Sequence, residues 1–128
     1  MAAAQIGRRL RDHDLSRTSY NVLTILAAAP GPLGPHDLAE QLFVSPGAVT
    51  QLVDLLQKQG RIQRRAHPND RRMSLVELTA AGRRVLARAQ PEVAEATLKT
   101  LAGLSAGEQE QLMKLLSKLE RHVQTLDQ

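Results

Sequence analysis

Hydrophobic positions recur at the spacing of an α-helix along most of this chain. Between residues 15 and 29, apolar side chains return every three or four positions, which predicts a helix. The Pro-Gly-Pro sequence at 30–32 ends it, because proline cannot continue a helix. Upstream, Ile6 and Leu10 lie four residues apart and predict a shorter helix. The first part of the chain is therefore expected to be helical.

Two short helices with a tight connection follow. Pro35 is favoured at a first helical position and begins a helix expected over 35–42. Ser45 is a good N-cap, and Pro46 begins the next helix, which is expected over 46–59. Two helices joined by so short a connection predict a helix-turn-helix.

The second of these helices has one apolar face and one small or polar face. The apolar positions are Val49, Leu52, Val53 and Leu56. The opposite face carries Gly47, Gln51, Asp54 and Lys58, with Thr50 on its flank. A helix that is held by one face and leaves small or polar groups on the other can enter the major groove of duplex DNA.

The next segment predicts one antiparallel hairpin. Residues 61–65 alternate, and residues 73–78 are β-branched and apolar enough to pair with them. Residues 66–72 between them are rich in turn formers and end on two arginines. Arg64 and Arg65 are expected either to contact DNA or to pair with Glu77 across the hairpin. A hairpin directly after the helix pair predicts a winged helix-turn-helix.

Long helices end the chain. Thr79 is expected to cap a helix through Val93, with a kink at Pro91. Ser105 and Glu108 have the spacing of a capping box at the start of the last helix. The apolar stripe of that helix is longer than a small lobe needs, so it is expected to pack on a second copy of the chain. Its members include Leu112, Leu116, Leu119 and Val123.

Together these elements predict a mainly α (α+β) fold. A winged helix-turn-helix DNA-binding domain is expected over 15–90. It is flanked by a short N-terminal dimerisation segment at 1–14 and by C-terminal dimerisation helices over 91–128.

Composition narrows the function. The 128 residues include no cysteine, which excludes disulfides, thiolate metal sites and cysteine chemistry. Tyr20 and Phe43 are the only aromatic residues, too few for stacking on single-stranded nucleic acid. Neither a membrane span nor a signal peptide is visible, so we expect a cytoplasmic protein.

The positive charge is concentrated in one segment. Residues 58–72 carry six basic side chains and one acidic one, a net charge of +5 in a chain whose total is +4. Such a patch is typical of a phosphate-binding surface, although charge alone fits a solvated face equally well. A winged helix that binds protein rather than DNA is the alternative function, and salt-dependent binding to duplex DNA distinguishes the two.

The sequence offers no candidate for catalysis or for a cofactor. It has no phosphate loop and no nucleophile with a matched base, so we do not expect an enzyme. The histidines are scattered without metal-ligand spacing, and no metal or other cofactor is expected. They are His13, His36, His67 and His122.

Two stretches resemble the MarR family of transcription regulators. Residues 38–42 and 45–54 resemble the core helices of the family. Residues 69–83 are similar to its wing: Asp70 and Arg72 form Asp-x-Arg, an apolar strand follows, and the stretch closes on Leu-Thr-x-x-Gly. The similarity covers roughly residues 15–125.

The resemblance implies a homodimeric repressor that binds a pseudo-palindromic operator. Ile6 and Leu10 would then join the C-terminal stripe in the dimer. Asp70 would orient Arg72, which would lie in the minor groove. The implied recognition-helix contacts are Ser45, Pro46, Gly47, Ala48, Thr50 and Gln51, and the implied wing contacts are Arg64, Arg65, His67, Arg71 and Arg72.

The chain departs from the family pattern at several points. Many members carry arginine where this chain has Gln51 and Leu55, and most have a longer first helix. Members often release DNA when they bind a small phenolic or lipophilic molecule, so such an effector is an expected partner here. Release by thiol oxidation is excluded, because the chain has no cysteine.

Overall fold

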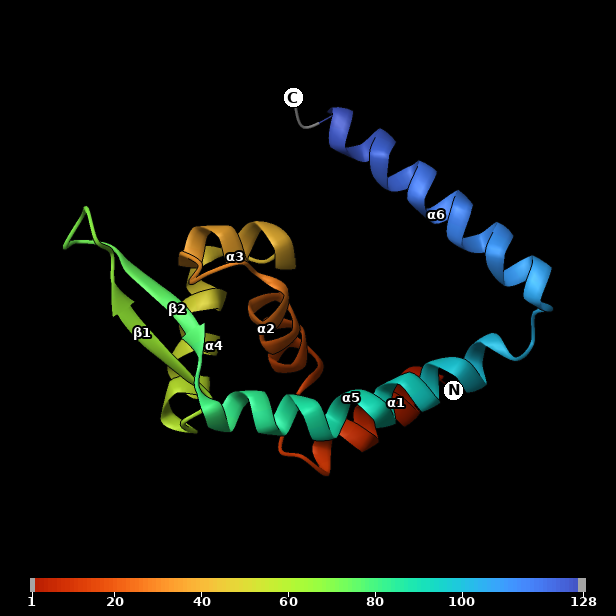
Figure 1. The fold of residues 1–128 in the computed structure, drawn as a ribbon, viewed down its shortest axis with the longest axis horizontal. Helices are drawn as coiled ribbons and strands as arrows, with labels where there is room; N and C mark the ends of the chain where they lie inside the picture. The colour runs from red at the N-terminus through yellow and green to blue at the C-terminus, as the bar shows by residue number, and fades with distance from the viewer. Residues whose placement is uncertain (1, 127–128) are drawn as a thin grey trace.

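A computed structural model describes residues 2–126 of the chain, and within them it contains six helices and one two-stranded sheet (Figure 1). The elements are α1 (Ala2–Arg11), α2 (Arg17–Ala28), α3 (Pro35–Leu42), α4 (Pro46–Lys58), β1 (Ile62–Ala66), β2 (Ser74–Leu78), α5 (Ala80–Leu101) and α6 (Ala106–Leu126). This order confirms the predicted winged helix-turn-helix with flanking helices. Residue 1 and residues 127–128, which were assigned to the terminal dimerisation segments, lie outside the described residues.

Capping side chains set where the helices begin. The Ser45 hydroxyl accepts a hydrogen bond from the Ala48 amide at 3.2 Å, which confirms Ser45 as the N-cap of α4. Thr79 does the same for α5, accepting from the Gly82 amide at 3.0 Å. The first long helix begins slightly later than expected, at Arg17, because Ser16 takes the N-cap position.

The core lies inside the winged lobe, where α2, α3 and α4 pack against the sheet and α2 also packs against α5. Its largest fully buried side chains are Leu10, Leu15, Val22, Leu23, Leu38, Val49, Val53, Leu56, Ile62 and Val76. Leu33 extends the sheet, because its backbone exchanges hydrogen bonds of 3.0 and 2.7 Å with Val76. The helix pair and the wing are therefore parts of one packed unit.

The hairpin register decides which wing side chains face α4. β1 and β2 are antiparallel, with Ile62 opposite Leu78 and Arg64 opposite Val76. Because side chains alternate along a strand, Arg64 lies on the same face as the buried Ile62. Arg65 lies on the other face, where Glu77 is also found.

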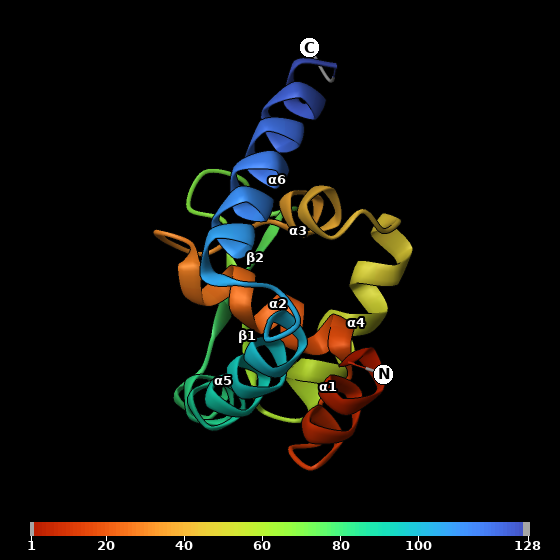
Figure 2. The same ribbon diagram turned by 90° about the vertical axis from the view of Figure 1, so that its right-hand side faces the viewer.

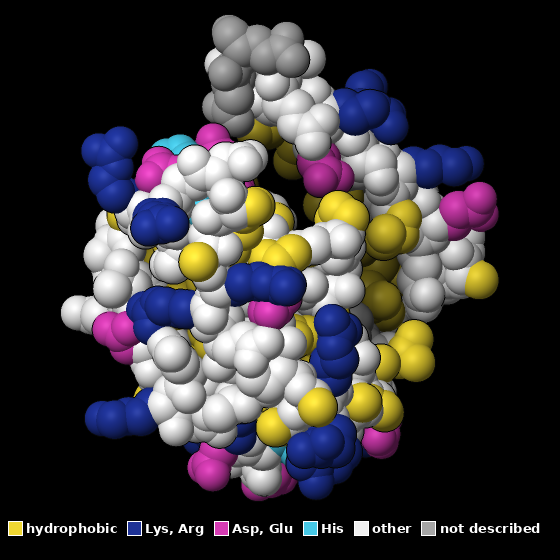
Figure 3. Space-filling view, turned by 60° about the vertical axis from the view of Figure 1, so that its left-hand side comes forward, with side chains coloured by type: hydrophobic (Ala, Val, Ile, Leu, Met, Phe, Trp, Pro, Cys, Tyr) yellow, Lys and Arg dark blue, Asp and Glu magenta, His cyan; other side chains and the backbone are white. Residues whose placement is uncertain are grey.

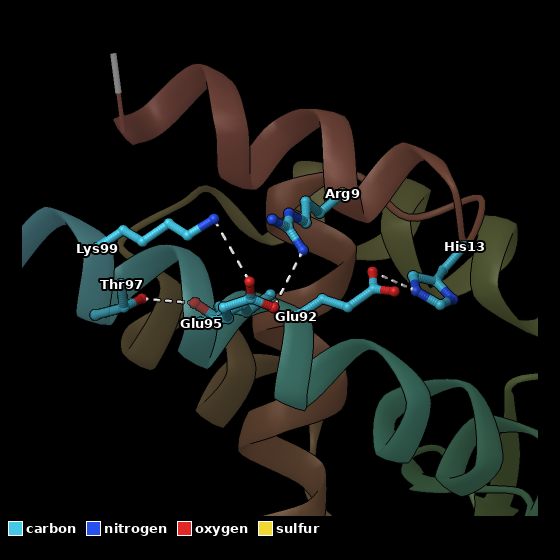
Figure 4. Close-up of polar contacts among 7 residues, drawn as sticks. Arg9, His13, Glu92, Glu95, Thr97 and Lys99 are labelled. Atoms are coloured by element: carbon cyan, nitrogen blue, oxygen red, sulfur yellow. Dashed lines mark hydrogen bonds and ion pairs between the residues drawn. The ribbon is translucent and has the colours of Figure 1, made fainter.

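Helix α5 links the winged lobe to the outer helices and continues through Pro91. The predicted boundary at residues 90 and 91 therefore lies inside one helix. α1 packs along the second half of α5, and polar contacts between the two helices include an ion pair (Figure 4). The His13 Nε2 lies 2.8 Å from Glu92 Oε2, and Arg9 lies 3.4 Å from Glu95.

Helix α6 begins beyond the end of α5 that is remote from the winged lobe, and it turns back while standing apart from the lobe (Figures 1 and 2). Its start is the predicted capping box: the Ser105 amide donates to Glu108 Oε1 at 2.9 Å, and the Glu108 amide donates to the Ser105 hydroxyl. Hydrogen bonds from Ser105 hold the pKa of Glu108 below its ordinary value. None of the described residues of α6 is buried, so its apolar stripe has no cover within the chain.

Candidate nucleic-acid interface

Helix α4 presents the predicted polar face to solvent. Val49, Val53 and Leu56 are buried against the lobe. Gly47, Gln51, Asp54 and Lys58 are all exposed, as is Thr50 on the flank. The face that would enter a groove is therefore open, and nothing in the described chain covers it.

The N-terminus of α4 lies on this open surface. Ser45, Pro46 and Gly47 are exposed, and Ala48 is half-buried. Pro46 has no amide hydrogen, and the Ala48 amide donates to the Ser45 cap. The amide of Gly47 is therefore the one that this turn leaves for another partner. Thr50 donates its hydroxyl hydrogen to the Pro46 carbonyl at 3.1 Å and keeps its acceptor lone pairs. This end of the helix suits a phosphate or a base edge.

Arg64, expected as a wing contact, is instead bound to α4. Its guanidinium lies 2.5 Å from Asp54 Oδ1 and also donates to the Gln57 side-chain oxygen. The strand alternation described above causes this, since it directs Arg64 to the helix and away from Glu77. The pair joins β1 of the wing to α4.

Two further wing residues have partners within the hairpin. Arg65 forms an ion pair of 3.4 Å with Glu77, as one of the two alternatives predicted. The Nδ1 atom of His67 accepts a hydrogen bond from the Asn69 amide at 3.0 Å. His67 thus shapes the loop, while Arg65 keeps most of its side chain in solvent.

The tip of the wing carries its most accessible cations. The side chain of Arg72 is 94 % exposed, and its Nε lies 3.6 Å from Asp70 Oδ1. The same carboxylate oxygen accepts from the Arg72 amide at 3.0 Å. Arg71 is also exposed. Asp70 therefore contacts both the backbone and the side chain of Arg72.

Basic side chains are spread over the side of the molecule that carries the wing, with acidic and apolar groups between them (Figure 3). One of the cations in the basic segment, Arg61, has an internal role. Its guanidinium donates to the backbone carbonyls of His13 and Asp14 at 2.9 and 2.8 Å, which ties the base of the wing to the turn after α1. Its part in the positive patch is therefore limited.

Two exposed apolar side chains on the helix pair are not among the site residues that the sequence predicted. Leu55 lies on the open face of α4, where helical periodicity places it next to Gln51. Phe43 is 91 % exposed in the turn between α3 and α4, and its φ of 56° lies in the left-handed region. The position of Leu55 follows from the helical spacing, but no local signal marks Phe43.

Other kinds of site are not visible in the part of the chain that the structure describes. It contains no group of three His, Cys, Asp or Glu side chains arranged to hold a metal ion. None of its helices is long and apolar enough to cross a membrane.

The geometry agrees with known proteins. A sequence model of the MarR family matches residues 13–73. The HTH-type transcriptional regulator YkoM of Bacillus subtilis (strain 168) is 32% identical over 119 residues, which cover 93% of this chain and 77% of YkoM. The chain belongs to the MarR family of transcriptional regulators.

Solved structures share the whole fold. A probable transcriptional regulator from Pseudomonas aeruginosa is 31% identical, with a TM-score of 0.78 over 92% of this chain and 90% of its own. MepR of S. aureus, solved in complex with DNA, is 22% identical and has a TM-score of 0.83 over 94% of this chain and 89% of its own. The MarR-type winged helix therefore extends from α1 to α6 in this chain.

Proposed function

We propose that this MarR-family regulator is a sequence-specific repressor that binds duplex DNA as a homodimer on a pseudo-palindromic operator. The observation that carries the proposal is the open polar face of α4 beside a wing whose tip presents Arg71 and Arg72. A helix for the major groove and a basic loop for the adjacent backbone are what a winged helix uses to bind DNA. The structure of MepR in complex with DNA supports the same use of this fold.

Helix α4 and the wing have different roles in this proposal. Gln51 reads a base edge in the major groove, where its amide matches the donor and acceptor pair of adenine. Ser45 and Gly47, at the helix N-terminus, bind a phosphate through backbone amides. Arg72 enters a narrow minor groove, where it adds affinity with little direct base reading. Asp70 positions Arg72, and Arg64 positions the wing.

The dimer is formed by the uncovered stripe of α6. Leu116, Leu119 and Val123 are exposed along this stripe and Leu112 is half-buried, in a helix that stands apart from its own lobe (Figure 1). Ile6 on α1 is half-buried and contributes at the edge. Leu10 differs, because it is 1% exposed and packs in the core of its own chain, so it supports a dimer only by holding α1 in place. Two-fold symmetry then sets two half-sites roughly 10 bp apart.

A small lipophilic or phenolic ligand releases the DNA in this proposal. A hollow of about 490 Å³ lies between α1 and α2, within the size range of small-molecule sites. Arg8, Arg11 and Leu15 are among the residues that line it. Its mixed apolar and cationic lining suits an aromatic acid.

Three single variants test the division of roles. Affinities for a selected operator and for random duplex are measured across a salt series for Gln51→Ala, Arg72→Ala and Asp70→Ala. Gln51→Ala should lose about 1–3 kcal/mol of discrimination at one position in each half-site. Arg72→Ala should weaken binding to the operator and to random duplex alike. It should also reduce the magnitude of the slope of log affinity against log salt concentration by about one per half-site. Asp70→Ala should behave as a milder Arg72→Ala.

Arg121→Ala is the matched control, because it removes the same charge from an exposed position on α6. It should leave the salt slope unchanged. If Arg72→Ala also left random-duplex affinity and salt slope unchanged, the wing assignment would be wrong. If the wild-type protein bound no duplex in a salt-dependent way, the protein-interaction alternative would replace DNA binding.

A further inference from the structure

Leu55 stands out on the recognition helix because an apolar side chain occupies a polar face. It is 46% exposed although it is a large hydrophobic residue of α4. It follows Gln51 by four positions and Gly47 by eight, so the three residues form one ridge along the helix. If Gln51 contacts a base in a groove, Leu55 therefore contacts a base pair close to it.

Two polar side chains next to Leu55 already have a partner. Arg64 binds Asp54 at 2.5 Å and also donates to Gln57. Asp54, Leu55, Gln57 and Lys58 line a shallow hollow of about 480 Å³ on the helix surface. Among these four described residues, Leu55 and Lys58 are the two that Arg64 does not bind. This half of the helix therefore presents an apolar contact beside a cation.

We propose that Leu55 is a specificity-determining residue that reads the 5-methyl group of a thymine in the major groove. This inference rests on the proposed DNA binding. Among the four bases, thymine is the one that presents a methyl group on its major-groove edge. Apolar side chains recognise this methyl group by contact. A cytosine at this position offers no methyl, and its exposed amino donor would face Leu55 without a partner.

Helix geometry fixes where the thymine should lie. Four residues of helix span about 6 Å along the axis, which is roughly two base-pair steps. An adenine read by Gln51 should therefore be accompanied by a thymine about two base pairs away in each half-site. Lys58 lies on the same face and reaches toward the flanking phosphate.

The test removes the methyl group without changing base pairing. The preferred site is first selected from a random duplex library with wild-type protein. Each thymidine of that site is then replaced by 2′-deoxyuridine, first in one half-site and then in both, and affinity is measured for wild type, Leu55→Ala and Leu55→Met. At one thymine, uracil should weaken wild-type binding about fourfold, or about fifteenfold when both half-sites carry it, as expected for the loss of one buried methyl contact each.

Leu55→Ala should bind the thymine and uracil sites equally, and Leu55→Met should keep most of the difference. Gln51→Ala is the matched control and should lose affinity while it keeps the uracil effect. Thermal melting confirms that the variants fold. If no thymine responds to uracil in wild type, or if Leu55→Ala keeps the full response, the inference is overturned while DNA binding stands. If no site is selected at all, the proposed function itself fails.

Discussion

Phe43 adopts a backbone conformation that suits glycine better than a residue with a side chain. It follows the last residue of α3 with φ 56° and ψ 41°, and its amide hydrogen closes the helix on the carbonyls of Ala39 and Glu40. The left-handed region costs a residue with a Cβ atom roughly 1–2 kcal/mol. Its ring is almost fully exposed, so packing within the chain does not offset that cost.

Comparing Phe43→Gly with Phe43→Ala isolates this strain. Both variants remove the exposed ring, but only alanine keeps the Cβ atom. Relief of the strain should raise the free energy of unfolding of the glycine variant by about 1 kcal/mol relative to the alanine variant. The greater entropy of glycine in the unfolded chain reduces this difference. Urea denaturation of the two proteins checks it. Equal stabilities would mean that the turn relaxes out of the left-handed region when the ring is removed.

Sequence patterns at the residue scale predicted the polar face of α4 and the helix caps, but not the side chains that Arg64 contacts. The polar face of α4 followed from helical spacing, and Ser45 and Thr79 were found from their capping chemistry. The partner of Arg64 did not follow, because it depends on the hairpin register and on where the strand crosses α4. Those are tertiary relations that adjacent residues do not encode.

At the scale of elements, a close approach between α5 and the start of β1 fixes the wing on the lobe. The Arg61 carbonyl accepts a hydrogen bond from the Thr79 amide at 3.1 Å. The Thr79 hydroxyl donates to the Gly60 carbonyl at 2.6 Å. A Cβ atom on Gly82 would lie 2.0 Å from the Arg61 carbonyl oxygen. This contact gives the Leu-Thr-x-x-Gly stretch a physical meaning that the sequence alone did not supply.

Gly82→Ala should therefore destabilise the protein although alanine favours helices. Two backbones would have to separate, and overpacking of this kind costs about 1–3 kcal/mol. The measurement is the free energy of unfolding by urea denaturation. Gly107→Ala is the matched control, since it lies in α6 with nothing near its added methyl group. Its free energy of unfolding should rise through helix propensity, by less than the roughly 0.5–1 kcal/mol of a helix interior, because Gly107 is the second residue of α6. If Gly82→Ala had the same free energy of unfolding as wild type, α5 could shift away from Arg61 without loss of stability.

At the scale of the whole molecule, the chain consists of a packed lobe and an uncovered helix. The lobe buries its apolar residues around α2, α3, α4 and the sheet. α6 leaves Leu115, Leu116, Leu119, Val123 and Leu126 exposed, which is unusual for a stable single chain. The sequence indicated this stripe by its length. It did not show how α6 is directed, because that depends on the turn after α5 and on what the stripe packs against.

A charged residue within the stripe should separate the dimer without unfolding the lobe. Leu116→Glu combined with Val123→Glu places carboxylates where two copies are proposed to meet, and burying unpaired charge is strongly unfavourable. Sedimentation at tens of micromolar should show wild type as a dimer and the double variant as a monomer. Lys118→Glu, on the polar side of α6, is the control and should stay dimeric.

The separated lobes should also bind DNA differently. Each monomer keeps its own α4 and wing, so random-duplex binding should persist, while operator affinity should fall because two half-sites are no longer linked. A wild-type protein that sediments as a monomer would contradict the dimer. A double variant that stays dimeric would place the interface elsewhere, on a surface other than the uncovered stripe of α6.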